Sequence, residues 1–139
     1  MAGINYGKVF VSGIVAAVVM TLGEFVLNEV VLVEAQTAAF ERMNLEPPGG
    51  AAIGVFIGLT FLAAWTMMWL YAAIRGPMGA GPKTAACAGI VTWLLMNFTA
   101  SVSFAAMGML PVGTVAVATA WGFVEFTLAA IAGAYFYRD

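Results

Sequence analysis

Four long apolar stretches alternate with short polar segments along this chain. Each stretch reaches the length of about 20 residues that an α-helix needs to cross the hydrocarbon core of a bilayer. The pattern therefore predicts an all-α membrane protein, a single domain in which four transmembrane helices form a bundle. The predicted spans are residues 9–31, 51–74, 84–109 and 113–136.

The polar segments between the spans predict one further helix and two turns. In the first segment, which begins at Glu34, apolar residues recur at helical spacing. We expect there a short amphipathic helix that lies at the membrane interface and ends at Pro47 and Pro48. The second segment, residues 75–83, is broken by glycine and proline and predicts a loop. The third, residues 110–113, is a tight turn, so spans three and four are expected to be antiparallel neighbours.

Composition supports the membrane class and excludes several others. Hydrophobic residues make up 63% of the 139 residues, charged residues make up 9%, and the mean hydropathy is +1.00. Soluble domains have about a quarter of their residues charged. The net charge of −2 and the lack of any lysine or arginine run exclude nucleic acid as the expected partner. With no histidine and the single cysteine Cys87, we expect no metal site and no cofactor.

The basic residues predict the orientation of the chain. Lys8, Arg75, Lys83 and Arg138 fall on one side of a four-span protein, and Arg42 falls on the other. The positive-inside rule then places both termini in the cytoplasm. A cleaved N-terminal signal is the alternative for the first stretch, but its length and its internal glutamate favour a retained helix.

Two glutamates lie inside the apolar stretches, Glu24 in the first and Glu125 in the last. A carboxylate at membrane depth costs roughly 3 kcal/mol on insertion scales, so it normally faces a partner or a water-filled cavity. At a rise of 1.5 Å per residue from the basic anchors, polar residues of all four spans fall at about 20 to 24 Å. The predicted layer of inward-facing polar residues is Glu24, Asn28, Thr60, Asn97, Ser101 and Glu125.

Small residues recur at four-residue spacing on several of the spans. Such stripes let helix backbones approach closely in lipid, where packing drives association. In the first and last spans the stripe includes the glutamate, so each glutamate is predicted to lie on the contact face of its helix. The predicted packing residues are Gly13, Ala17, Gly54, Gly58, Gly122 and Ala129.

Two interpretations of the polar layer stay open. In the first, the chain is a non-enzymatic structural or accessory protein, either a homo-oligomer or a subunit of a larger membrane complex, and protonated carboxyls join the helices through hydrogen bonds. In the second, it is a small proton-coupled transporter or ion-conducting protein that uses Glu24 and Glu125, because two adjacent carboxyls in a low dielectric cannot both ionise. No catalytic residue is assigned, since a carboxyl pair alone supplies little catalytic chemistry.

Several segments resemble a known group of proteins. Residues 5–16, the GEFVLN motif at 23–28, residues 69–75 and 81–85, and the WGFVEF motif at 121–126 are similar to small bacterial four-helix integral membrane proteins with no established activity. The resemblance covers most of the chain and implies the architecture and a bacterial inner membrane. A looser similarity, in size and helix number, is to small multidrug resistance transporters, which carry a glutamate in their first helix. This chain departs from them in its acidic first loop and its second glutamate.

Overall fold

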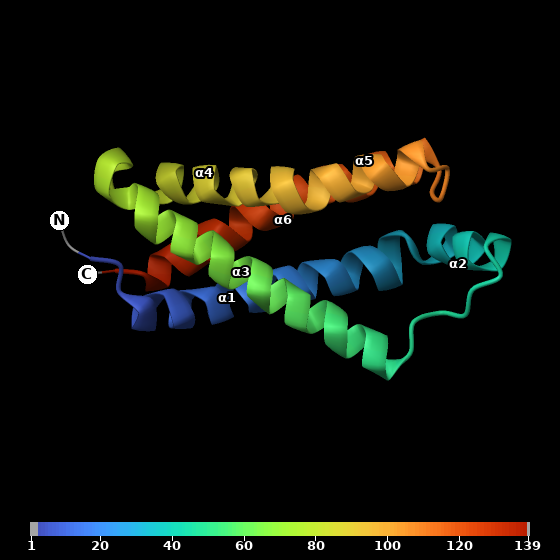
Figure 1. Ribbon diagram of the computed structural model, residues 1–139, viewed down its shortest axis with the longest axis horizontal. Helices are drawn as coiled ribbons and strands as arrows, with labels where there is room; N and C mark the ends of the chain where they lie inside the picture. The colour runs from blue at the N-terminus through green and yellow to red at the C-terminus, as the bar shows by residue number, and fades with distance from the viewer. Residues whose placement is uncertain (1–2, 139) are drawn as a thin grey trace.

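In the computed structural model, which describes residues 3–138, every regular element is a helix (Figure 1). Four helical segments are long and apolar enough to cross a membrane. The predicted all-α class with four such segments is therefore confirmed. The segments are Tyr6–Val31, Gly50–Met78, Pro82–Ala106 and Val112–Phe136.

Two of these segments contain a wider π-helical turn. The first consists of α1 (Tyr6–Val26) and the π turn η1 (Leu27–Val31). The third consists of α4 (Pro82–Trp93), the π turn η2 (Leu94–Phe98) and α5 (Thr99–Ala106). The other two, α3 (Gly50–Met78) and α6 (Val112–Phe136), are α-helical throughout. π turns are rare and often mark functional sites, and the hydrophobic pattern did not predict them.

A short helix, α2 (Val33–Arg42), follows η1 directly. Asn44 just beyond its end has a left-handed φ of 52°, and the backbone N–H of Leu45 donates to the carbonyl of Phe40 at 2.9 Å. These are features of a Schellman cap, which satisfies carbonyls that a helix end leaves free. The predicted end at Pro47 and Pro48 is therefore wrong, because this local cap stops the helix earlier.

The third spanning segment also ends earlier than predicted. Gly108 has a φ of 70°, and the N–H of Met109 donates to the carbonyl of Phe104 at 3.0 Å. This second Schellman cap terminates α5 at Ala106, so the predicted limit at residue 109 is wrong.

The second spanning segment extends further than predicted. α3 continues past Arg75 to Met78 and contains Pro77. A proline in the last turn removes only one backbone bond, so the helix tolerates it there. The loop that the sequence predicted from residue 75 begins at Gly79, whose φ of 84° suits glycine. Pro82 then starts α4 at a position that proline favours.

α6 lies at the centre of the packing. It contacts α1, α3, α4 and α5, and α3 also packs against α1 and α4. α3 crosses α1 at an angle, so that its N-terminal part diverges from the other helices (Figure 1). The core at these crossings consists largely of alanine and methionine. Its completely buried members include Ala16, Ala17, Ala64, Met67, Met68, Ala129 and Ala130.

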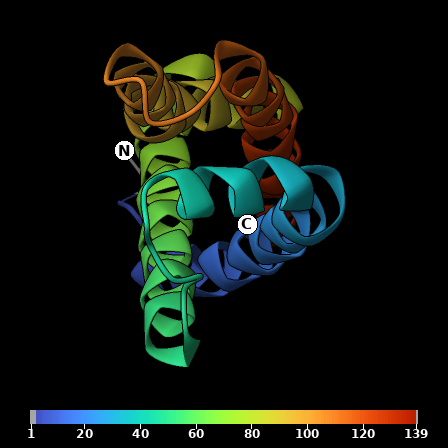
Figure 2. The same cartoon turned by 90° about the vertical axis from the view of Figure 1, so that its right-hand side faces the viewer.

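Both ends of the described chain meet at one end of the molecule, which we call the termini end (Figure 1). There the ammonium of Lys8 donates to the carbonyl of Arg138 at 2.6 Å, and a guanidinium N–H of Arg75 donates to the carbonyl of Tyr137 at 3.1 Å. The opposite end, which we call the α2 end, carries α2 across it (Figure 2). The guanidinium of Arg42 there donates to the carbonyl of Met109 in the α5–α6 connection at 2.7 Å.

Candidate functional site

Gly23 of α1 lies against the side chain of Glu125 on α6. Glu125 is 6% exposed. A Cβ at Gly23 would overlap Oε2 of Glu125 and lie 2.9 Å from its Cδ. Any larger residue at position 23 would therefore displace this carboxyl group from its position.

Trp121 fixes the position of this carboxyl. Its indole N–H lies 3.2 Å from the carbonyl of Gly23 and 3.2 Å from Oε2 of Glu125. Trp121 and Glu125 are four residues apart on α6, a spacing that places both on the same face of the helix. One indole donor therefore connects the backbone of α1 with the carboxyl of α6.

Glu24 joins the site from the next position of α1. Its side chain interacts directly with that of Glu125. The two glutamates that the sequence placed at the same height are therefore neighbours, and we call them the carboxyl pair.

A line of hydrogen bonds connects the carboxyl pair with α2. The amide of Asn28, which lies in η1, donates to the carbonyl of Glu24 at 2.8 Å and to its Oε2 at 3.1 Å. The amide of Gln36 on α2 donates in turn to Oδ1 of Asn28. We call Glu24, Asn28 and Gln36 the polar chain. Asn28 was predicted in the polar layer from its position in the first span. Gln36 was not, because it lies in the segment between the spans and no contact with them was predicted for it.

Four buried side-chain atoms have no hydrogen-bond partner within residues 3–138. They are Oγ1 of Thr21, Oδ1 of Asn97, Oγ1 of Thr119 and Oε1 of Glu125. Buried polar atoms in proteins are normally paired, and an unpaired one calls for an explanation such as a bound water or ion. One of them, Oε1 of Glu125, belongs to the carboxyl pair.

Three members of the predicted polar layer form no hydrogen bond with the carboxyl pair within residues 3–138. Thr60 donates to the carbonyl of Phe56 in its own helix at 2.9 Å. It is separated from the site because α3 diverges from α1, so equal height did not bring it close. Ser101 is half-buried on α5, beyond η2, and forms no hydrogen bond with either glutamate. Asn97 lies in η2, beside α6, where it contacts Gly122.

The predicted packing residues divide into two groups. Gly13 faces the ring of Trp65, Gly122 faces Asn97, and Ala17 and Ala129 are fully buried. Gly54 and Gly58 have no atom within 4 Å of the Cβ they would carry. Their predicted helix contact is not found in the described chain, because they lie on the divergent part of α3.

Two close-packing glycines, Gly23 and Gly89, were missing from the predicted set. A Cβ at Gly89 would lie 2.7 Å from the carbonyl oxygen of Phe126, where α4 meets α6. Gly133 belongs to the stripe of small residues predicted on the last span. A Cβ there would lie 2.9 Å from the carbonyl oxygen of Ser12, where α6 meets α1.

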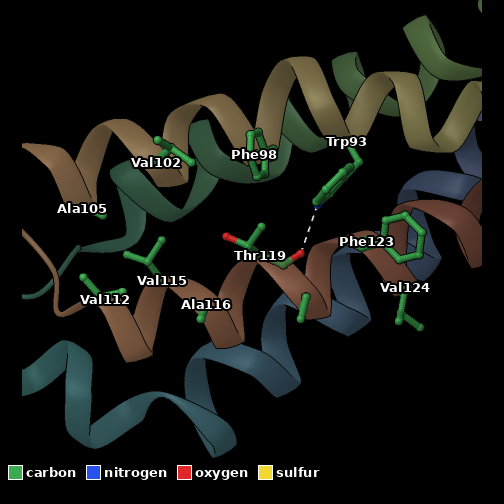
Figure 3. Close-up of a pocket in the computed structure, with 11 residues that line it drawn as sticks. Trp93, Phe98, Val102, Ala105, Val112, Val115, Ala116, Thr119, Phe123 and Val124 are labelled. Carbon is green, nitrogen blue, oxygen red and sulfur yellow. Dashed lines mark hydrogen bonds between the residues drawn. The ribbon is translucent and has the colours of Figure 1, made fainter.

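An apolar groove of about 660 Å³ lies between the third segment and α6 (Figure 3). Trp93 forms part of its wall, where its indole N–H donates to the carbonyl of Thr119 at 3.1 Å and its ring meets that of Phe123 edge-on at 5.1 Å. The lining contains no charged side chain, so the groove adds no acid or base to the carboxyl pair. Its lining residues are Trp93, Phe98, Val102, Ala105, Val112, Val115, Ala116, Thr119, Ala120, Phe123 and Val124.

Among the described residues there is no group of three or more histidine, cysteine or acidic side chains that could hold a metal ion. Comparison of the chain with protein families, with curated proteins and with solved structures finds no match. Function is therefore argued from the geometry of the carboxyl pair.

Proposed function

We propose that this chain is a multi-pass membrane protein in which the four long helices form a transmembrane bundle and α2 lies at the interface. Large apolar side chains on its outer surface support this proposal. Phe25, Leu62 and Leu128, on three different segments, are each more than half exposed, as expected for residues in contact with lipid. The basic side chains at the termini end favour a cytoplasmic location for both termini, in a bacterial inner membrane.

Within this bundle the carboxyl pair takes up and releases protons, as the site of a small proton-coupled transporter or ion-conducting protein. The observation that carries this proposal is the contact of buried Glu125 with Glu24. The basic side chains stand at the two ends of the molecule, so none neutralises the pair. Two carboxyls in contact within a low dielectric cannot both ionise, so the pair holds at least one proton that it can exchange.

The unpaired polar atoms favour proton exchange over a purely structural role. Carboxyls that only join helices would have each oxygen satisfied by a donor, because an unsatisfied buried polar atom is costly. Here Oε2 of Glu125 accepts from Trp121, whereas its Oε1 has no partner in the described chain. Because the side chain of Glu24 interacts with this carboxyl, a proton on Oε1 can be shared between the two groups.

A structural or accessory role, in a homo-oligomer or as a subunit of a larger membrane complex, is the second candidate. It is favoured by the Trp121 indole, which connects Gly23 of α1 with Glu125 of α6. In this role Glu125 keeps its proton permanently and stabilises the α1–α6 contact. The two roles differ in whether the carboxyl exchanges its proton.

The test replaces the carboxyls with amides. Glutamine keeps the shape of a protonated glutamate but cannot release a proton, so Glu24→Gln and Glu125→Gln are expected to fold. We expect both variants to lose proton flux in proteoliposomes that contain a pH-sensitive dye. Thr66→Val, at an exposed position of α3 away from the carboxyl pair, is the control and is expected to keep the flux.

The outcome against the proposal is equally specific. Infrared difference spectra of the wild-type protein, recorded from about pH 5 to about pH 9, should show a carboxyl band that titrates and that disappears in Glu125→Gln. A wild-type protein with neither proton flux nor a titrating band would exclude proton exchange and leave the structural role.

A further inference from the structure

The surroundings of the carboxyl pair differ between the two ends of the molecule. Toward the termini end, the α1–α6 contact is made by small and apolar residues. Ala16 and Ala129 are completely buried there, as is Met68 of the adjacent α3, and Gly133 touches the backbone of Ser12. The Ser12 hydroxyl donates to the carbonyl of Val9 in its own helix at 3.2 Å, and the hydroxyl of Thr21, one turn from Glu24, has no partner within the described residues. The buried alanine, glycine and methionine residues between these two hydroxyls supply no polar side chain that could continue a path.

Toward the α2 end, the polar chain leads away from the pair. Asn28 binds Glu24, and Gln36 of α2 binds Asn28. All three side chains of the polar chain are partly exposed, in contrast to the fully buried residues of the other half. The chain thus runs from the interior to the helix that lies across this end (Figure 2).

A π turn lies where this connection forms. In η1 the backbone N–H of Leu32 donates to the carbonyl of Leu27 at 2.8 Å, five residues earlier instead of four. The turn begins three residues after Glu24 and contains Asn28, whose amide binds the Glu24 carbonyl. A bend at Leu32, directly after η1, leads the chain into α2.

We propose that protons reach the carboxyl pair from the α2 end alone, through water held by Asn28 and Gln36, and that α2 covers this entrance. This inference rests on the proposed function, since it gives the route to the same site. Water in an apolar interior needs polar partners, and side-chain amides supply a donor and an acceptor without a fixed charge that would trap the proton.

Charge at the α2 end suits this route. Glu29, Glu34, Glu41 and Glu46 are all exposed there, against the single basic residue Arg42. An excess of negative charge around an entrance raises the local concentration of cations, including protons. The termini end, with its cluster of basic side chains, has the opposite charge.

The experiment measures how fast the protonated carboxyl exchanges with D₂O. The full chain is reconstituted in lipid with Cys87→Ala, and the infrared carboxyl band assigned through Glu125→Gln is followed after a switch to D₂O. Gln36→Cys is then labelled with a bulky, charged thiol reagent. We expect labelling to slow the exchange by about tenfold or more, equal to about 1.4 kcal/mol of added barrier. The matched control is Thr37→Cys, on the exposed side of α2, where the same label should leave the rate unchanged.

The outcomes separate the inference from the proposed function. If the carboxyl exchanges but the label at position 36 has no effect, or has the same effect as the label at position 37, the entrance is not at the polar chain and the inference is wrong. Ser12→Cys tests the other side, because Ser12 is a buried residue of the α1–α6 contact toward the termini end. If this cysteine reacts with the reagent and the label slows exchange, the entrance lies at the termini end and the inference is wrong. If the wild-type carboxyl does not exchange at all, the proposed function fails and the inference fails with it.

Discussion

Gly122 of α6 faces Asn97 of η2 so closely that a Cβ on the glycine would lie 2.7 Å from the amide Nδ2 of the asparagine. This contact joins the last helix to the third spanning segment, three residues from the glutamate of the carboxyl pair. It connects the packing of the helices with the geometry of the polar interior.

Replacing Gly122 by leucine is expected to destabilise the protein. The larger side chain overpacks the contact with Asn97, which typically costs about 1 to 3 kcal/mol. The control is Val124→Leu, because Val124 is 54% exposed and its replacement should change stability by less than about 0.5 kcal/mol. Thermal unfolding in detergent, followed by circular dichroism, measures both. Equal midpoints for the two variants would show that Gly122 is not at a close contact.

Gly23→Ala should destabilise the protein and displace the Glu125 carboxyl. The new methyl group overlaps Oε2 of Glu125, and we expect a loss of about 1 to 3 kcal/mol. The matched control is Gly54→Ala, in a helix position with no atom within 4 Å, where alanine should be neutral or should stabilise by up to about 1 kcal/mol. Opposite signs for the two substitutions are the expected result. A stabilising Gly23→Ala would contradict the α1–α6 contact.

Trp121→Phe is expected to weaken the same contact from the other side. Phenylalanine keeps an aromatic ring but loses the indole N–H, so Oε2 of Glu125 is left without its donor, at about 1 to 3 kcal/mol. Trp69→Phe, on a side chain that is 45% exposed, serves as the control and should be near neutral. Unfolding midpoints give the stability, and the position of the infrared carboxyl band reports whether the environment of Glu125 has changed. An unchanged band in Trp121→Phe would mean that the indole does not bind the carboxyl.

Topology reporters provide a fourth prediction. The basic residues at the termini end predict that reporters fused to the C-terminus and inserted near Gly81 are cytoplasmic, and that one near Gly49 is outside. Paired reporters that are active on opposite sides of the membrane measure this directly. A reporter near Gly49 on the cytoplasmic side would invert the orientation, and the entrance at the α2 end would then open to the cytoplasm.

The number of spans and the identity of the carboxyl pair could be predicted from the sequence because both depend on distances along helices. Apolar run length gives the spans, and height above the basic anchors placed Glu24 beside Glu125. The height of a residue along its helix does not tell which way its side chain points. It also does not tell how far that helix lies from its neighbours. Thr60 was therefore assigned to the same layer although α3 diverges from α1.

The remaining parts of the site depend on tertiary contacts that produce no periodic pattern of residues in the sequence. Gln36 binds Asn28 because the bend at Leu32 places α2 beside η1, and nothing in the composition of residues 27–31 distinguishes a π turn from an α-helix. The helix ends at Arg42 and Ala106 follow from left-handed caps at Asn44 and Gly108. The predicted limits depended on the positions of prolines and on the ends of apolar runs. Neither of these features determines where a left-handed cap forms.

The two π turns make the site sensitive to chain length as well as to residue type. A π turn holds more residues than the α-helical turn it replaces, so deleting a single residue from Leu94–Phe98 would let the helix close as an ordinary α-helix. Side chains outside the turn would keep their faces, because the π turn accommodates the extra residue locally, whereas side chains inside the turn, among them Asn97, would shift. Asn97 would still be present in the sequence, but its side-chain amide would then point away from α6. A one-residue deletion at η1 or η2 can therefore abolish the site while every residue named in it is kept.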